Sequence, residues 1–464
     1  MKFNGKYLIT LILLKSFLTP ALVSATTLEE ALIQTYNTNP NMLADREESK
    51  ANDEVIIQAI AEFLPNISSG IRRSKNFSNA KISNENLQKN LYDRTDYTNH
   101  QEITLEQSLF NGGASLLQIK IAKKFIEASR AQLAEKEQKV FLNAINAYIN
   151  VLSTAEKVKI YQNSVELLKK HLESIEDRFA LNDVTRTDLG QAKARFSQSL
   201  SELTKAQGAH TNAKNTYEAI VGLKAENLET LKDIEDTPPS LDDAIKLSLV
   251  NNPSIISARL MTDIEANKIL QNVTRFAPRV TLQASLSRDI SPNYSYSYEV
   301  NRPIEIKTRN KQATINLELP LYQKGLEYQA VRKQKHLYQK SKNELQAENN
   351  KLINETMKTW EDINLYNSIL KASIDGIESA TIALEGVTQE AQLGQRTTLD
   401  VLETEQELLK SQLTALDARY NKIMNIYALK SHLGILTARS MNLSTTIYDP
   451  KVHYDKIKFK IIGF

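Results

Sequence analysis

Cysteine is absent from this sequence, and glycine and proline are scarce. Without cysteine the chain cannot form disulfides, use a thiolate nucleophile, or bind zinc or iron–sulfur clusters through sulfur. Only 13 glycines and 11 prolines occur among 464 residues, whereas glycine alone makes up ~7% of an ordinary protein. This shortage of helix-breaking residues favours long, uninterrupted helices over a fold rich in loops.

The sequence also lacks an excess of either charge and, beyond its first residues, any long apolar run. Its 58 basic and 55 acidic residues are interspersed and leave a net charge of +3, which argues against a nucleic-acid partner. No later segment approaches the ~18 consecutive apolar residues of a membrane-spanning helix. If the mature chain crosses a membrane, a closed β-barrel is the remaining means.

The first residues are typical of a secretory signal peptide covering residues 1–25. Lys2 and Lys6 supply its positive start, Leu8–Leu14 its apolar stretch, and Val23–Ala25 a small-residue cleavage site. The mature chain is expected to begin near Thr26. A retained anchor is the alternative, but a lysine and a proline interrupt the apolar stretch.

An internal duplication is the most informative feature of the chain. The segment that starts at Leu28 aligns without gaps on the one that starts at Leu241, so that Asn39-Pro40 falls on Asn252-Pro253. Further along, Gly113 falls on Gly325 and Asp188 on Asp400. These collinear matches predict one repeat over residues 26–237, a second over 238–437, and a short C-terminal tail over 438–464.

Each repeat has the same expected order of elements. Helices begin at the caps Thr27 and Ser240 and restart at a proline. Period-two alternation then predicts strands near 65–78, 99–110, 278–290 and 311–322, separated by polar loops at about 78–99 and 289–310. About seventy proline-free residues follow, which predicts helical hairpins over 113–222 and 325–436 with arms of roughly 100 Å.

Apolar residues in the long helices recur at nearly heptad spacing. One seam joins Val140, Ala144, Ala147, Val151 and Val158, and a neighbouring seam joins Phe141, Ile145, Tyr148, Leu152 and Ala155. A soluble coiled-coil scaffold or a periplasmic adaptor would explain the helices but not the paired strands. The smallest transmembrane barrels have about eight strands. Since this chain has four, several copies of the chain would have to contribute their strands to one closed barrel.

The motifs and their order together resemble the TolC family of outer-membrane efflux proteins. The resemblance covers Thr27 to about Leu436 and depends on the duplicated NP helices and on four further segments: SLFNGG (Ser108–Gly113), RFALNDVTRTDLGQAKA (Arg178–Ala194), LPLYQKG (Leu319–Gly325) and QLGQRTTLDVLETEQ (Gln392–Gln406). It implies a mainly α fold with a β-barrel, in which a homotrimer shares twelve strands in outer-membrane lipid and extends a helical tunnel into the periplasm.

The resemblance also implies a function. Such proteins are exit ducts of tripartite efflux pumps and type I secretion systems, and they work with a periplasmic adaptor and an inner-membrane efflux pump or ABC transporter. They are not enzymes. In keeping with this, we find no catalytic constellation, cofactor-binding loop or metal-binding spacing in the sequence.

The residues expected to matter lie at the two hairpin turns. Asn182 and Gly394 fit left-handed turn positions, and the resemblance implies that both turns meet the adaptor, together with Asp183 and Gln395. It also implies a latch, formed by Thr187, Asp188 and Arg396, that holds the entrance shut; Ala391 replaces a tyrosine of this network. Ordinary helix capping by Asp188 after Thr185 is the alternative.

Asp400 and Glu403 form a second candidate site. They are three residues apart and hence neighbours on one helix face. Threefold repetition would collect six carboxylates at one constriction, favouring cations. A solvated helix face is the alternative. Outside the helices, Tyr294, Tyr296 and Tyr298 alternate and could contribute to an aromatic girdle.

Overall fold

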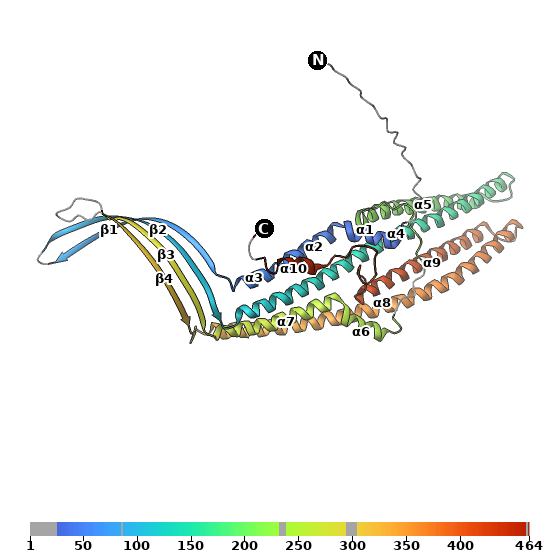
Figure 1. Ribbon diagram of the computed structural model, residues 1–464. Coiled ribbons are helices and arrows are strands. Elements are labelled where there is room, and N and C mark those ends of the chain that lie inside the picture. The colour runs from blue at the N-terminus through green and yellow to red at the C-terminus, as the bar shows by residue number, and fades with distance from the viewer. Residues whose placement is uncertain (1–25, 85–86, 232–237, 294–303, 461–462, 464) are drawn as a thin grey trace, which may run out of the picture. The chain divides into compact units, whose positions relative to one another are not determined.

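The computed structural model describes residues 26–464 except 85–86, 232–237, 294–303, 461–462 and 464 (Figure 1). The expected signal peptide and the three alternating tyrosines lie outside these residues. Two compact units make up the chain: one comprises Met1–Thr35, Asn143–Ile234 and Ser368–Tyr420, and the other comprises Tyr36–Leu142, Glu235–Asn367 and Asn421–Phe464. The first holds the turns of the long helices, and the second holds the sheet.

The first repeat begins with α1 (Leu28–Thr38), α2 (Pro40–Asp53) and α3 (Val55–Ala61). The predicted cap is present, because Glu30 N donates to Thr27 Oγ1 at 3.1 Å and Thr27 N donates to Glu30 Oε2 at 3.0 Å. Asn39 caps α2 by accepting hydrogen bonds from two backbone amides of its first turn, and Pro40 takes the first helical position.

The second repeat reproduces these helices as α6 (Leu241–Asn251) and α7 (Pro253–Val273), followed by the 3₁₀ turn η1 (Thr274–Phe276). Ser240 caps α6 and Asn252 caps α7, again with a proline at the first helical position. The helix starts expected at the two NP pairs are therefore confirmed.

The sheet contains β1 (Asn66–Asn84), β2 (Leu87–Asn111), β3 (Arg279–Asn293) and β4 (Ile304–Glu318), all antiparallel and in that order (Figure 1). The two repeats meet where β2 pairs with β3. Within the described chain, the outer edges of β1 and β4 have no neighbouring strand.

The strands are longer than predicted. The segment 78–99, expected to be a polar loop, continues β1 to Asn84 and begins β2 at Leu87. The segment 289–310 likewise continues β3 to Asn293 and begins β4 at Ile304. The prediction was wrong because these outer portions are largely polar, so the apolar alternation that identifies a strand is missing there.

The two faces of the sheet differ in chemistry. One face, here called the apolar face, includes the cross-strand row Ile67–Leu105–Ala284–Ala313. The opposite, polar face includes the adjoining row Ser68–Thr104–Ser285–Gln312, in which the hydroxyls of Ser68 and Thr104 lie 2.6 Å apart. Because side chains alternate along a strand, the register fixes which face each residue joins.

Two long hairpins follow the strands. The first consists of α4 (Ala114–Ala180) and α5 (Arg186–Val221), and the second of α8 (Leu326–Gln392) and α9 (Thr398–His432). Both α4 and α8 have 67 residues, so each extends roughly 100 Å. No helix in the described part of the chain is long and apolar enough to cross a membrane.

The start of α4 depends on a glycine. Gly112 has a φ of 68°, and a Cβ atom added there would lie 2.5 Å from Cβ of Ala277 and 2.8 Å from the carbonyl oxygen of Thr274. Only glycine fits both the left-handed backbone and the close approach. This contact fixes the junction of β2 and α4 against η1 of the second repeat.

The long helices bury most of each seam expected from the heptad pattern, whereas Ala155 and Val158 at the ends of the seams are half-buried. Val140, Ala144, Ala147 and Val151 are buried, as are Phe141, Ile145, Tyr148 and Leu152 on the neighbouring seam. The hydroxyl of Tyr148 lies 2.9 Å from Thr26 O and 2.7 Å from Glu229 O. Burying a tyrosine without such partners would cost free energy, so these bonds stabilise the start of the described chain.

The C-terminal tail contains α10 (Pro450–Ile457), which the sequence interpretation missed and which packs on α2. Asp449 caps it by accepting a hydrogen bond from Lys451 N. His453 Nδ1 lies 3.4 Å from Oδ2 of the buried Asp53, whose other carboxylate oxygen lies 3.5 Å from Arg130 Nη2. Tyr454 packs against the apolar cluster around Ile56.

Candidate functional site

The turn between α4 and α5 closes with two backbone hydrogen bonds. Asn182 N donates to Phe179 O at 3.0 Å, and Asp183 N donates to Arg178 O at 2.9 Å. Asn182 has a φ of 62°. This is the Schellman arrangement, in which a left-handed residue lets the last carbonyls of a helix find donors. Asparagine tolerates that conformation better than most residues.

The turn between α8 and α9 repeats the arrangement at the matching positions. Gly394 N donates to Ala391 O at 3.2 Å, and Gln395 N donates to Glu390 O at 2.9 Å, with a φ of 75° at Gly394. The predicted left-handed roles of both turn residues are therefore confirmed. Asn182, Asp183, Gly394 and Gln395 are all exposed.

Identical capping boxes restart the chain after each turn. Asp188 N donates to Thr185 Oγ1 at 3.1 Å, and its carboxylate accepts from Thr185 N at 2.9 Å. In the second hairpin, Asp400 N donates to Thr397 Oγ1 at 3.2 Å, and its carboxylate accepts from Thr397 N at 2.9 Å. Hydrogen bonds to the ionised form lower the pKa of Asp188 and of Asp400. Both stay negatively charged at neutral pH.

The salt bridges at the two turns run in opposite order along the chain: the arginine precedes the acid at the first turn, and the acid precedes the arginine at the second. Arg178 Nε lies 2.7 Å from Asp183 Oδ2, whereas Arg396 Nε lies 2.8 Å from Glu390 Oε2. Within one described chain, therefore, Asp188 caps its own helix and Arg396 pairs with Glu390. The latch between Asp188 and Arg396 stays a prediction. Thr187, its third expected member, is exposed beside Asp188.

The acidic pair lies on the first turns of α9. Glu403 is exposed and Asp400 half-buried, and three helical positions separate them. The matching residues in the first hairpin are Asp188 and Gln191, so α9 carries one more carboxylate than α5 on this face. A ring of such pairs stays a prediction.

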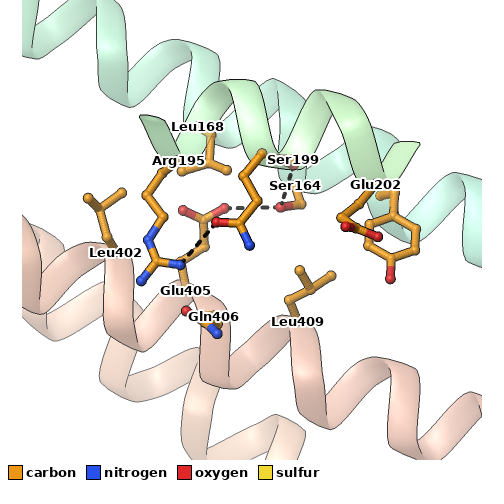
Figure 2. A pocket seen from close by; sticks show the side chains of 11 residues that line it. Ser164, Leu168, Arg195, Ser199, Glu202, Leu402, Glu405, Gln406 and Leu409 are labelled. Carbon is orange, nitrogen blue, oxygen red and sulfur yellow. Dashed lines mark hydrogen bonds between the residues drawn. The ribbon is translucent and has the colours of Figure 1, made fainter. Parts of the chain in front are cut away.

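A carboxyl group that the sequence interpretation missed lies two residues after Glu403 on α9. Glu405 is buried, with 6% of its surface exposed, and it points toward Ser164 of α4, whose hydroxyl donates to Glu405 Oε1 at 3.3 Å (Figure 2). A cavity of about 140 Å³ surrounds them, with Arg195 and Leu409 in its wall. Burial raises the pKa of Glu405 to about 7, while Ser164 and Arg195 oppose the rise.

The sequence did contain a signal for this residue. Leu402, Glu405 and Leu409 follow the three-then-four spacing of one helix face, so an acid stands on the apolar stripe of α9. Its counterpart in α5, Lys193, is exposed and pairs with Glu176 at 3.1 Å. The two hairpins are therefore alike at their turns and different in their contacts.

Comparison with known proteins agrees with this duplicated architecture. The family model for outer membrane efflux proteins matches residues 32–223 and again 244–435. The chain belongs to the outer membrane efflux protein family. The two matches fall on the two repeats, each covering a set of short helices, two strands and a long hairpin.

Individual efflux-family relatives align over nearly the full chain. The outer membrane efflux protein BepC of Brucella suis is 25% identical over 440 residues, covering 94% of this chain and 91% of BepC. The outer membrane protein TolC of Escherichia coli is 24% identical over 427 residues, covering 89% and 84%. The crystal structure of the Campylobacter jejuni CmeC outer membrane channel superimposes with a TM-score of 0.73 at 14% identity, covering 93% and 89%.

These findings confirm the predicted fold, the outer-membrane location with helices in the periplasm, and the assignment as a channel protein instead of an enzyme.

Proposed function

We propose that three copies of this chain form one channel across the outer membrane, which serves as the exit duct of a tripartite efflux pump or a type I secretion system. The sheet carries the proposal. Four strands cannot close alone, and the outer edges of β1 and β4 have no neighbouring strand within the described chain. An unpaired edge in lipid would leave backbone groups without hydrogen-bond partners.

Copies of the same sheet solve this problem. In the antiparallel order β1–β2–β3–β4, β4 runs opposite to β1, so β4 of one chain can pair with β1 of the next. Three chains give twelve strands, an even number within the range of outer-membrane barrels. The apolar face then contacts lipid, and the polar face lines the interior.

The hairpin turns support the periplasmic part of the proposal. Leu181 and Leu393, adjacent to the left-handed residues, are 79% and 75% exposed. Two exposed leucines at matched turns favour contact with a protein partner, and we propose a periplasmic adaptor that joins the duct to an inner-membrane pump or ABC transporter. Asp188, Thr187 and Arg396 would hold the entrance closed between neighbouring hairpins.

Cysteine cross-linking tests the shared barrel, because the native chain has no cysteine. Ser69→Cys on β1 should form intermolecular disulfides with one or two of the cysteines scanned along β4 from Lys311 to Leu317, and native mass measurement should give three chains. Ile103→Cys on β2, whose two neighbours belong to the same chain, is the control and should not cross-link. A monomer whose β1 and β4 never cross-link would refute the proposal.

A further inference from the structure

Basic residues gather on the apolar face of the sheet, at the end away from the helices. Beyond the row of Ile67, this face presents Arg73 and Lys75 on β1, Arg288 on β3, and Arg309 and Lys311 on β4. We call these five residues the cationic rows. No carboxylate lies on this face among the strand residues whose side chains the structure describes.

The register brings two of these cations directly together. Gln101 pairs with Arg288, and Arg288 pairs with Arg309, so two guanidinium groups leave adjacent strands at the same level. Directly opposed side chains of a sheet lie about 5 Å apart, and like charges at such a pair are destabilising. An anion bound between or above the two guanidinium groups would relieve this repulsion.

One hydrogen-bond donor of Arg288 has no partner within the described chain. Its Nε atom is buried and has no hydrogen-bond partner. A groove of about 430 Å³ opens beside it, with the apolar Ile71, Ile103 and Leu286 and the cationic Arg288, Arg309 and Lys311 in its wall. Polar residues and one acid, Glu102, complete the lining, so the groove offers both apolar and cationic side chains.

Two acids of the adjoining rows, Asp289 and Glu102, belong to the polar face and are paired there. Asp289 Oδ1 lies 2.7 Å from His100 Nδ1, and Glu102 Oε2 lies 3.3 Å from His100 Nε2. Because Asp289 and Arg288 are consecutive residues of one strand, their side chains point to opposite faces. Both acids therefore pair with His100 on the polar face instead of with Arg288 or Arg309.

The position along the strands indicates which partner. Arg309 lies about ten residues from Leu319, or about 33 Å at ~3.3 Å per residue, and this corresponds to about 25 Å along the axis of a barrel tilted near 40°. That is the height of the apolar band. The cationic rows thus lie at the membrane edge away from the periplasmic helices, where lipid headgroups begin.

We propose that the cationic rows form a binding site for the phosphate groups of outer-leaflet lipids, with Arg288 and Arg309 as its centre. Guanidinium groups bind phosphate through paired hydrogen bonds, while Ile71, Ile103 and Leu286 contact the acyl chains. The inference rests on the proposed function, because it takes the apolar face as the lipid-facing side of a barrel.

Lipid binding to the purified full-length protein tests the site. Native mass spectrometry in a neutral detergent would compare lipid A, a glycolipid with two anionic phosphates, with phosphatidylcholine, whose single phosphate is neutralised by its own choline, and with inorganic phosphate. The wild-type protein should retain lipid A in preference to phosphatidylcholine, and inorganic phosphate should not displace it. Arg288→Gln with Arg309→Gln should weaken lipid A binding by about fivefold for each cation removed.

Arg72→Gln is the matched control. Arg72 pairs with His100 in the register, so it lies one row away on the polar face, and its loss should leave lipid A binding unchanged. Equal binding of lipid A and phosphatidylcholine by the wild-type protein, or unchanged lipid A binding by the double variant, would overturn the inference. If the double variant does not assemble, Arg309→Gln alone gives the same comparison.

The mass spectrum separates this inference from the proposed function. A wild-type protein that never forms trimers contradicts the shared barrel, whereas a trimer that does not distinguish the two lipids contradicts only the phosphate site.

Discussion

At the scale of single residues, the two capping aspartates have a double character. Each satisfies the free backbone amides of its own helix, and each remains ionised because those same bonds lower its pKa. A capped aspartate is therefore a fixed negative charge at a hairpin entrance. The cap and the proposed contact between hairpins can be tested separately. Thr185 takes part in the cap but not in the proposed contact of Asp188 with Arg396.

The latch hypothesis leads to the first prediction. Asp188→Ala and Arg396→Ser should both raise the conductance of the channel in planar bilayers, because each removes one side of a charged contact that holds the entrance closed. Such a bond contributes about 1.5–3 kcal/mol, so the ratio of open to closed channels should rise about tenfold or more.

Two control variants separate the latch from local stability. Thr185→Ala removes the cap of α5, at about 1 kcal/mol, but keeps the charge of Asp188. Glu390→Gln removes the partner that Arg396 has within its own chain. Both controls should conduct like the wild type, and wild-type currents in Arg396→Ser and Asp188→Ala would show that the latch does not exist.

Sequence reasoning performed well at the turns because their chemistry is local. A left-handed position favours Asn or Gly, and a capping box is a four-residue pattern, so Asn182, Gly394, Asp188 and Asp400 could be assigned without a fold. Glu405 was overlooked for the opposite reason. Its role depends on Ser164 of another helix, and only its place between Leu402 and Leu409 signalled burial.

At the scale of elements, the strands illustrate a limit of hydrophobic periodicity. The part of each strand near the helices alternates between apolar and polar side chains, so it could be predicted as a strand. The outer part has polar or charged residues on both faces, as Arg72 and Arg73 illustrate, and therefore looks like a loop. The helix α10 was missed because eight residues are too few for a periodic signal, although Asp449-Pro450 marks a helix start.

The contact between α4 and α9 gives the second prediction. Glu405 has an ordinary pKa of 4.5 and a folded-state pKa of about 7, so the folded chain binds its proton more tightly than the unfolded chain. This contribution to stability is complete below about pH 4.5 and declines as the pH rises through about 7. The loss is on the order of 3 kcal/mol per chain.

Thermal unfolding followed by circular dichroism at about pH 5 and about pH 8 would measure the effect. Glu405→Gln should be more stable than the wild type at the higher pH and should lose much of the pH dependence. Glu202→Gln changes another carboxylate of the same cavity, one that pairs with Lys205, and should retain it. A pH dependence unchanged by Glu405→Gln would exclude this glutamate as its source.

At the scale of the whole molecule, the acidic pair of α9 gives the third prediction. If three copies bring Asp400 and Glu403 to one constriction, their repulsion favours multivalent cations. Asp400→Asn with Glu403→Gln should then abolish block by trivalent cations and shift the reversal potential toward anions. Barrel assembly should persist, because neither side chain is buried in the core.

Thr397→Ala distinguishes charge from capping in this experiment. It removes the hydroxyl that binds Asp400 but leaves both carboxylates, so block and selectivity should remain. Unchanged block and unchanged selectivity in the doubly neutralised channel would mean that the pair is an ordinary solvated face of α9.

The contact of α10 with α2 also imposes an order in time. The chain emerges from its N-terminus, so Asp53 and Ile56 reach the periplasm long before His453 and Tyr454, which cover them. Until then Asp53 has only Arg130 as an ion-pair partner, and the side of the apolar cluster that Tyr454 later covers is exposed to water. The surroundings of α2 are therefore complete only after the last helix of the chain has arrived.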